Sequence, residues 1–396
     1  MRGNLLVGQS GGPTAVINAS LAGVIRTSGR SDAIDRIVGM RFGIEGFLGE
    51  ELVDLGALSD SEIDLLSNTP SSALGSCRYK LTDDDLPRIK DLLERHDIRY
   101  LLSIGGNDTM DTIHRIEKYC HATGYDLTGI GIPKTVDNDL YATDHTPGYP
   151  SAARYVALSV QQGGRLARDM QRVDQYTIFQ TVGRDAGWLA AAAALARNGD
   201  DDAPHLIYLP ERPINRDQVV SDVQAVVDRT GWCSIVVGEG IRWAGGTPVS
   251  ASSGSDGFSN VEYGAMGGVS AAIVLHRLIG EATGMRGEFQ ITESLIMASS
   301  DRVVPLDRTE AFACGESAVS RALDGESGVM VTIERTGAAD SYGATYGTAP
   351  LSEVAVRAKP MPDEFIAQSD VTGEFLDYAR PLVGELPAYY SFAGRE

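Results

Sequence analysis

The sequence lacks an apolar run long enough to span a bilayer, and no apolar region of signal-peptide length precedes its first glycine turn. Its four cysteines lie far apart with no paired spacing, which disfavours a zinc site and is typical of a reducing compartment. No basic stripe is present, and a formal net charge of -20 argues against nucleic-acid binding. We therefore expect a cytoplasmic protein without a membrane or nucleic-acid partner.

Lysine is scarce beside arginine, so a lysine inside an acidic loop stands out. The stretch 131–139 contains Lys134, Thr135, Asp137 and Asp139 directly after a strand-like segment. Carboxylates this dense repel one another unless a cation or a polar substrate lies among them, although a solvated turn remains the alternative. The negative net charge still allows a phosphate-bearing substrate, because a few local cations and Mg²⁺ can reverse the field in one cleft.

The first part of the chain repeats a pattern of strand, polar turn and helix. A chain of 396 residues favours two domains, or one large domain with insertions. Glycines after the first strand allow backbone N–H groups to approach an anion. Because carboxyl ends of parallel strands meet at one edge of a sheet, we expect the site at that edge. The strands expected here are 5–8, 100–104 and 129–132, and the helices start at Ala15 and span 84–96.

The second part of the chain continues the pattern after a turn-rich junction at 143–150, which is the expected domain boundary. A strand at 176–182 runs into Gly183 and Arg184, whose guanidinium fork can meet a phosphoryl group. The strand at 233–238 ends at Glu239, which is placed to hold a sugar hydroxyl. Further expectations are a strand at 205–210, a helix over 269–279 and a C-terminal tail that packs onto the body.

Six segments taken together in this order resemble the phosphofructokinase family, and the resemblance covers most of the chain. It implies Mg²⁺-dependent transfer of a phosphoryl group to a sugar hydroxyl, by a homodimer or homotetramer. The alternative of a nicotinamide-dependent dehydrogenase fails because the first turn is not a full dinucleotide fingerprint. The matching segments are 8–12, 105–108, 133–139, 143–148, 182–184 and 238–239.

The resemblance implies an α/β fold of two similar three-layer αβα domains with mostly parallel sheets. The donor domain is expected to comprise residues 1–148 plus about 264–305. The acceptor domain is expected to comprise residues 149–263 plus about 306–396, including the C-terminal tail.

The resemblance also implies roles for individual residues. Asp137 matches the general base for the acceptor hydroxyl, Asp139 a carboxylate that supports the metal, and Arg184 the cation on the transferring group. The expected catalytic residues are Asp108, Lys134, Thr135, Asp137 and Arg184; the donor-binding residues are Gly11, Gly12, Arg78, Asp108 and Lys134; the acceptor-binding residues are Thr135, Asp137, Val182, Gly183, Arg184 and Glu239; and the metal ligands are Asn107, Asp108 and Asp139.

Two positions argue for pyrophosphate rather than ATP as the phosphoryl donor. Family members that use ATP have glycines where this chain has Asp108 and Lys134, and members that use pyrophosphate are similar to this chain at both positions. Asp108 fills and negatively charges the place of an α-phosphate, whereas Lys134 can neutralise a leaving phosphate. An ATP-dependent sugar kinase and a non-catalytic sugar-phosphate sensor remain the alternatives.

The chain departs from the family pattern at the metal site and at the acceptor site. Asn107 stands where many relatives have a metal-binding aspartate, and the segment 287–302 has no glutamine-arginine pair. Gln175 stands near another expected arginine. Each lost charged contact to a phosphate costs on the order of 1.5–3 kcal/mol, so the acceptor is either fructose 6-phosphate or a polyol without that phosphate. The candidate replacement cations are Arg172, Arg286, Arg302 and Arg380.

Overall fold

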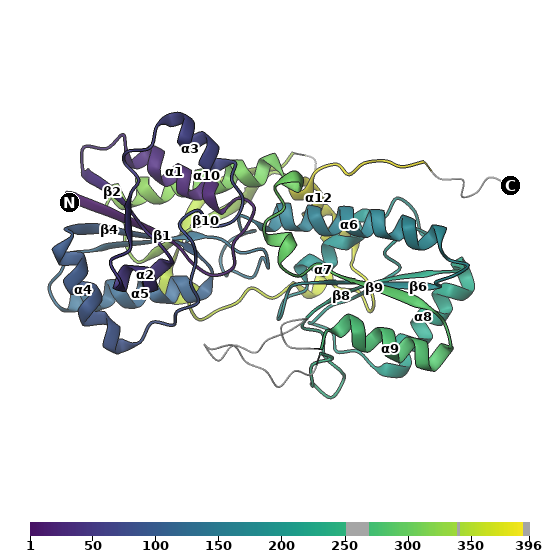
Figure 1. Ribbon diagram of the computed structural model, residues 1–396. Helices are drawn as coiled ribbons and strands as arrows, with labels where there is room; N and C mark the ends of the chain where they lie inside the picture. Colours follow the sequence, from purple (N-terminus) through teal and green to yellow (C-terminus); the bar gives the residue numbers. More distant parts are fainter. Residues whose placement is uncertain (251–268, 339–340, 391–396) are drawn as a thin grey trace.

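A computed structural model describes residues 1–250, 269–338 and 341–390, which form two lobes side by side (Figure 1). The first lobe is built on a seven-stranded sheet in the order β11-β10-β5-β4-β1-β2-β3, parallel except for the edge strands β3 and β11. Its strands are β1 (Gly3–Gln9), β2 (Ile34–Met40), β3 (Leu52–Asp54), β4 (Ile98–Gly105), β5 (Thr128–Pro133), β10 (Val329–Thr336) and β11 (Gly343–Pro350).

Helices cover both faces of this sheet because alternate strand residues point to opposite sides. Leu5 and Val7 belong to one buried cluster, and Leu6 between them belongs to the other. One face is covered by α1 (Ile17–Ser28), α3 (Asp60–Ser67) and α10 (Pro305–Leu323), and the other by α2 (Gly43–Leu48), α4 (Leu86–Arg95), α5 (Asn107–Ala122) and α11 (Leu351–Val354).

The second lobe has a smaller, fully parallel sheet in the order β7-β8-β6-β9. Its strands are β6 (Tyr176–Thr181), β7 (Leu206–Tyr208), β8 (Cys233–Gly238) and β9 (Gly287–Ile291). The helices α6 (Tyr149–Asp169), α7 (Trp188–Ala192) and α12 (Gly373–Val383) pack on one face, and α8 (Arg216–Thr230) and α9 (Ala271–Thr283) on the other. Short 3₁₀ helices are η1 (Asp83–Asp85), η2 (Ala193–Ala196), η3 (Glu293–Met297), η4 (Ser300–Arg302) and η5 (Asp363–Phe365).

The strand pairings contradict the predicted assignment of two late segments. Strand β9 pairs with β6 and α9 packs on the same sheet, so these two elements of the range of about 264–305 belong to the second lobe. Strand β10 pairs with β5, so α10, β10 and β11 belong to the first lobe and not to the second. Helix α10 packs closely on α1 because each helix has a glycine at the contact, Gly23 on α1 and Gly315 on α10. A Cβ on Gly23 would lie 2.1 Å from the Phe312 carbonyl oxygen.

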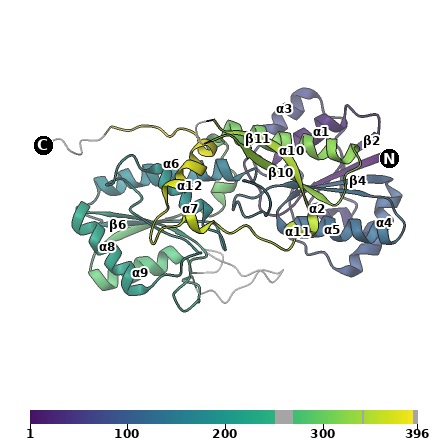
Figure 2. The same cartoon turned by 180° about the vertical axis from the view of Figure 1, so that it is seen from behind.

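The layered α/β class and most predicted elements are confirmed, with one shifted helix. Helix α1 begins at Ile17 and not at Ala15, so residues 10–16 form a separate glycine loop between β1 and α1. The predicted tail packs along α6, where Arg154, Gln161 and Arg165 donate hydrogen bonds to carbonyls between Val383 and Tyr390. From α11 the chain crosses to the second lobe over residues 355–362, which we call the crossing segment (Figure 2).

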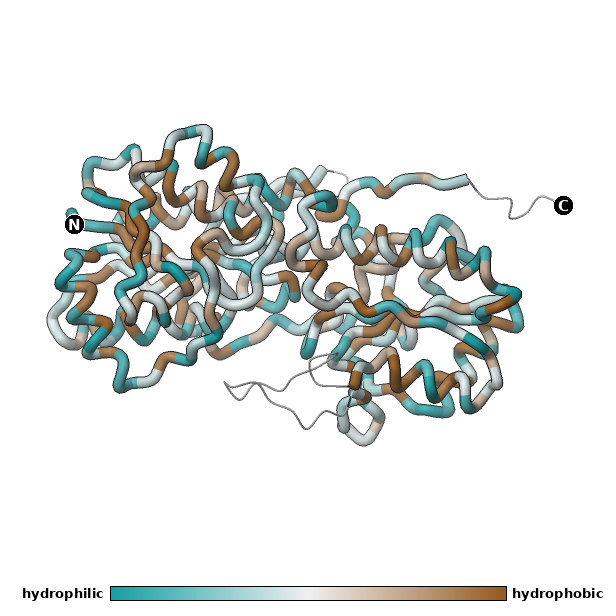
Figure 3. The backbone as a smooth tube through the Cα atoms, viewed as in Figure 1, coloured by the Kyte–Doolittle hydropathy of each residue, from teal (hydrophilic) through white to brown (hydrophobic). Residues whose placement is uncertain are grey.

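Hydropathy follows this layering, since the apolar residues concentrate on the strands and on the helix faces that cover them (Figure 3). Among the described helices, none combines the length and the apolar character that a membrane span requires.

Candidate functional site

Three strand ends of the first lobe meet at one edge of its sheet. The backbone N–H of Ser10 donates to the Ile104 carbonyl at 3.0 Å, and that of Lys134 donates to the Gly105 carbonyl at 3.1 Å. These bonds join the glycine loop, the start of α5 and the acidic loop, by which we mean residues 134–144. Strand β1 lies between β4 and β2, so this is the point where the strand order reverses, the usual place for ligands in such sheets.

Lys134 lies beneath the glycine loop and is only 2% exposed. Its ammonium donates to the carbonyl oxygens of Ser10 at 2.7 Å and Gly12 at 2.6 Å. Gly11 has a φ of +75°, and a Cβ there would lie 3.3 Å from Lys134 Nζ, so glycine is needed for this close approach. Burial lowers the pKa of Lys134 to about 8, against the Asp137 and Asp139 carboxylates, which raise it.

Asp137 has an unsatisfied oxygen: its Oδ1 is buried and accepts no hydrogen bond among the described residues. Its backbone N–H donates to Thr135 Oγ1 at 3.1 Å, which fixes the turn. Burial, followed by the Asp139 and Glu239 carboxylates, raises the pKa of Asp137 to about 7, although Arg184 and Lys134 lower it. A carboxylate with this pKa near neutrality is suited to accept a proton.

Asn138 and Asp139 complete the acidic loop. Asn138 is fully buried with a φ of +56°, a conformation that asparagine tolerates better than most residues. Its Oδ1 accepts from the Thr146 N–H at 3.1 Å, and its Nδ2 donates to the Tyr378 hydroxyl at 3.0 Å. Burial raises the pKa of Asp139, which lies in the same crowded loop as Asp137.

The predicted metal ligands Asn107 and Asp108 open helix α5. Asn107 Oδ1 is buried without a hydrogen-bond partner among the described residues, while its Nδ2 donates to the Arg357 carbonyl. Asp108 is exposed. In the described ranges, no three His, Cys, Asp or Glu side chains converge as a ready-made metal site. Carboxylate and amide oxygens are ligands that Mg²⁺ accepts, and it commonly takes one or two from a protein while water and substrate phosphates complete its shell.

Arg78 lies in a loop that packs against the glycine loop. The Gly11 N–H donates to the Cys77 carbonyl at 3.3 Å, and Ser76 Oγ donates to the Gly11 carbonyl. Arg78 itself is exposed. It thus adjoins the predicted donor site, although its side chain is not enclosed there.

Arg184 and Glu239 follow the adjacent strands β6 and β8 of the second lobe. Arg184 Nε lies 4.0 Å from Glu239 Oε1, which also accepts from the Gly183 N–H at 3.4 Å. Gly183 has a φ of +122°, and a Cβ on Gly240 would lie 1.6 Å from the Arg184 carbonyl oxygen. Val182 is half-buried against the core of this lobe. Arg184 lowers and Glu239 raises the pKa of Asp137, so charges of the second lobe act on this carboxylate of the first lobe.

Gln175 and two candidate replacement arginines do not lie at this edge. Gln175 precedes β6, and its backbone pairs with that of Arg286, which precedes β9. Arg172 also precedes β6. All three therefore lie at the amino edge of the second sheet, opposite Arg184 within the same chain.

Sequence reasoning missed the buried polar network behind the acidic loop. His145 is fully buried, with Nδ1 2.8 Å from Asp144 Oδ2 and Nε2 2.7 Å from Glu310 Oε2. These two carboxylates raise the pKa of His145 against the effect of burial. Lys359 also reaches this network from the crossing segment. His145 and Asp144 are neighbours in the segment 143–148, but no local pattern marks their contacts with Glu310 and Lys359, which are distant in sequence.

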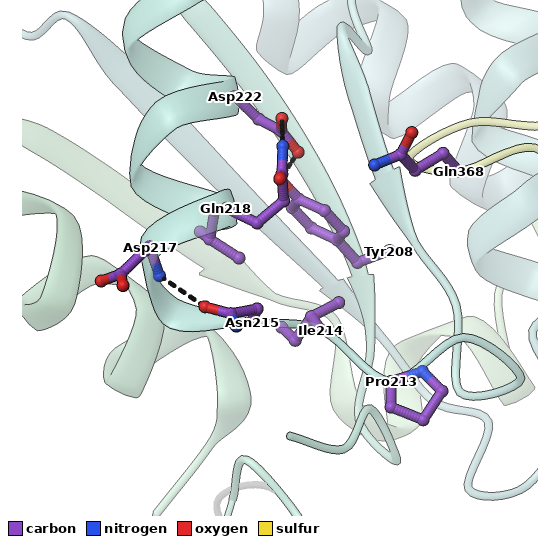
Figure 4. Close-up of a pocket in the computed structure, with 9 residues that line it drawn as sticks. Tyr208, Pro213, Ile214, Asn215, Asp217, Gln218, Asp222 and Gln368 are labelled. Atoms are coloured by element: carbon purple, nitrogen blue, oxygen red, sulfur yellow. Dashed lines mark hydrogen bonds between the residues drawn. The ribbon is translucent and has the colours of Figure 1, made fainter. Parts of the chain in front are cut away.

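A separate pocket of about 300 Å³ lies between β7 and the start of α8 (Figure 4). Asp222 accepts from the Tyr208 hydroxyl at 2.9 Å and from Gln218 Nε2. The pocket contains none of the predicted site residues.

Comparison with known proteins gives one family. The family model described as Phosphofructokinase matches residues 4–322. The pyrophosphate–fructose 6-phosphate 1-phosphotransferase of Rhodospirillum rubrum is 39% identical over 397 residues, covering 97% of this chain and 95% of the relative. The sulfofructose kinase of Alkalicoccus urumqiensis is 32% identical over 377 residues, covering 94% of each.

Among solved structures, the pyrophosphate-dependent phosphofructokinase from Nitrosospira multiformis is similar, with a TM-score of 0.87. It is 34% identical, and the match covers 98% of this chain and 94% of that one. The family match over most of the chain and these full-length similarities agree with the motifs at both sheet edges. The chain belongs to the phosphofructokinase family.

Proposed function

We propose that the protein transfers a phosphoryl group from pyrophosphate to the 1-hydroxyl of fructose 6-phosphate and releases orthophosphate. The observation that carries this proposal is that Lys134, buried against the glycine loop, and Arg184 act electrostatically on one carboxylate, Asp137. Relatives from Rhodospirillum rubrum and Nitrosospira multiformis bear names of this activity.

Each side chain then has a role in the transfer. Asp137 Oδ1 has no hydrogen-bond partner among the described residues. It accepts the proton of the acceptor hydroxyl while the hydroxyl oxygen attacks the terminal phosphorus of pyrophosphate. Arg184 stabilises the charge on the transferring group. Lys134 uses two of its three N–H groups on backbone carbonyls, and the third is available to the leaving phosphate.

Mg²⁺ is the proposed cofactor, with Asn107, Asp108 and Asp139 as its protein contacts. The unsatisfied buried Oδ1 of Asn107 supports this choice, because Mg²⁺ prefers oxygen ligands. When bound, the ion neutralises charge on the diphosphate. Asn107 and Asp108 would hold the ion at the start of α5.

The second candidate for the acceptor is a sugar that carries a sulfonate in place of the 6-phosphate. Arg302 donates to the Tyr155 carbonyl and Ser159 Oγ of α6, so its guanidinium is already engaged. Arg380 is 66% exposed on α12. A sulfonate has a single charge, whereas a phosphate carries about -1.5 to -2, so it requires fewer cations. We choose a sulfonated sugar as this candidate because one relative is named sulfofructose kinase.

An acceptor panel tests the proposal by measuring orthophosphate release with pyrophosphate and Mg²⁺. We expect fructose 6-phosphate to give a kcat/KM at least about tenfold above those of 6-deoxy-6-sulfofructose and fructose, since a charged contact contributes on the order of 1.5–3 kcal/mol. Preference for the sulfonate would select the second acceptor. Turnover of neither would reject the proposed function.

The pH dependence of kcat/KM for pyrophosphate should be bell-shaped. Asp137 must be ionised to accept a proton, and its pKa is raised to about 7, so activity falls below that pH. Lys134 must be protonated to bind the leaving phosphate, and its pKa is lowered to about 8, so activity falls above that pH. In a Lys134→Arg variant the fall of activity at alkaline pH should disappear, because arginine stays protonated. An unchanged fall at alkaline pH would mean that another group causes it.

We further propose a cytoplasmic homodimer or homotetramer. All four cysteines are free and buried, as expected for a reducing compartment. Light scattering of the purified protein would give the subunit number.

A further inference from the structure

The crossing segment runs alongside the acidic loop. Leu140 and Ala358 form an antiparallel bridge, and the Lys359 N–H donates to the Asp139 carbonyl at 2.7 Å. The Arg357 carbonyl accepts from Asn107 Nδ2 at 3.2 Å. The segment thus contacts both predicted metal-binding stretches of the first lobe.

The side chain of Lys359 joins the middle of the acidic loop to its C-terminal end. Its ammonium donates to Asn138 Oδ1 at 3.2 Å, to the Thr143 carbonyl at 3.1 Å and to the Asp144 carbonyl at 2.7 Å. A lysine ammonium has three N–H groups, and these acceptors use all of them. Lys359 therefore differs from Lys134: it has no donor left for a substrate. The chain's five lysines are Lys80, Lys90, Lys118, Lys134 and Lys359.

Lys359 also contacts the helix that follows Arg184. Its Nζ lies 4.9 Å from the centre of the Trp188 ring, and its carbonyl accepts from Trp188 Nε1 at 3.5 Å. Trp188 is the first residue of α7 and is 2% exposed, so its ring is fixed by packing. One residue therefore joins the loop of Asp137 in one lobe to the helix behind Arg184 in the other.

We propose that Lys359 is a positioning residue that sets the placement of Asp137 relative to Arg184, an inference that rests on the proposed phosphoryl transfer. The two groups act on the same substrates from different lobes, so their relative placement decides whether hydroxyl, phosphorus and leaving oxygen align. A misplacement of about 1 Å can lower a rate by about 10²-fold.

Steady-state kinetics of Lys359→Met test this role, because methionine keeps the length of the side chain and removes all three N–H groups. We expect kcat to fall by about 10- to 100-fold with the KM for pyrophosphate within about threefold. Lys359→Arg, which keeps the charge, should have a kcat at least about threefold above that of Lys359→Met. A kcat within twofold of wild type, or a raised KM alone, would overturn the proposal.

Two further variants separate positioning from loss of stability. Lys118→Met removes an exposed lysine on α5, and Phe375→Leu loosens the buried packing of α12. We expect the first to match wild type, and the second to lower Tm without changing kcat per folded molecule. Equal losses of kcat in Phe375→Leu and Lys359→Met at equal Tm would mean a merely structural role and would overturn the proposal.

Amide hydrogen exchange supplies a readout that needs no turnover. In Lys359→Met, peptides covering residues 134–148 should exchange faster than in wild type and in Lys118→Met, because Asn138, Thr143 and Asp144 lose their shared donor. Unchanged exchange would contradict the proposed contact. If wild-type protein turned over no acceptor, the proposed function would fail, while this exchange experiment would still decide whether Lys359 holds the loop.

Discussion

Asp137→Asn is expected to lower kcat with pyrophosphate by about 10²- to 10⁴-fold, the usual contribution of a general base. The amide keeps the shape of the side chain and its backbone bond to Thr135 Oγ1, but it cannot accept the hydroxyl proton. The loss should appear in kcat more than in KM, because proton transfer occurs only in the transition state. Coupled assay of orthophosphate release measures it.

The same variant should be at least as stable as wild type, and its advantage should grow with pH. Burial raises the pKa of Asp137 from 3.8 to about 7, so the folded state binds this proton more tightly than the unfolded state. The protonated carboxyl of Asp137 therefore leaves the folded state stable at acidic pH. This stability is lost as the pH rises from about 3.8 to about 7 and the buried group must ionise. The Tm difference between Asp137→Asn and wild type should therefore be near zero at pH 4 and positive at pH 8.

Asp126→Asn, an exposed aspartate before β5, is the matched control and should change neither kcat nor Tm. Undiminished turnover in Asp137→Asn would remove Asp137 from the role of base. A lower Tm at pH 8 would mean that the carboxylate stabilises the fold, contrary to its burial beside Asp139 and Glu239.

The edges of both sheets were predictable because local sequence determines them. Apolar runs such as Leu5 to Val7 are fully buried strands, and polar turns follow each run directly. Parallel pairing then brings those turns together, since every carboxyl end lies at the same edge. Lys134 and Asp137 at the first sheet, and Arg184 and Glu239 at the second, could thus each be paired from the sequence. Placing the two pairs in one predicted site depended on the resemblance to the family.

The return of the chain to the first lobe could not be predicted in this way. Strand β10 pairs with β5, and the adjacent hydrogen bond from the Gly129 N–H to Ser327 Oγ joins residues 198 positions apart. No local pattern specifies that partner. Lys359 reaches Asn138 from 221 residues away. His145 illustrates the converse problem: a histidine in a site motif is held between two carboxylates and serves the structure. Such roles depend on tertiary contacts and leave no periodic signal.

Replacing both Asp108 and Lys134 by glycine is expected to shift donor use from pyrophosphate toward ATP. Loss of the ammonium removes a charged hydrogen bond of about 1.5–3 kcal/mol, so kcat/KM for pyrophosphate should fall by at least roughly 10- to 150-fold. Loss of the carboxylate at the start of α5 frees the space and removes the repulsion that an α-phosphate would meet. We therefore expect ATP to become a competitive inhibitor against pyrophosphate, or a donor, only in variants that lack Asp108.

The single variants would separate the effect of Asp108 on ATP exclusion from the effect of Lys134 on pyrophosphate use. Asp108→Gly alone should retain pyrophosphate use and admit ATP, because Asp108 is exposed and Lys134 keeps its bonds to the Ser10 and Gly12 carbonyls. Lys134→Gly alone should lose pyrophosphate use and also lower Tm, since those buried carbonyls lose their donor. Asp217→Gly removes an aspartate from the same position of α8 and controls for glycine in a first helical turn. Equal ATP inhibition of wild type and all variants would show that these two residues do not exclude the nucleotide, and the choice of donor would then have to arise elsewhere in the cleft.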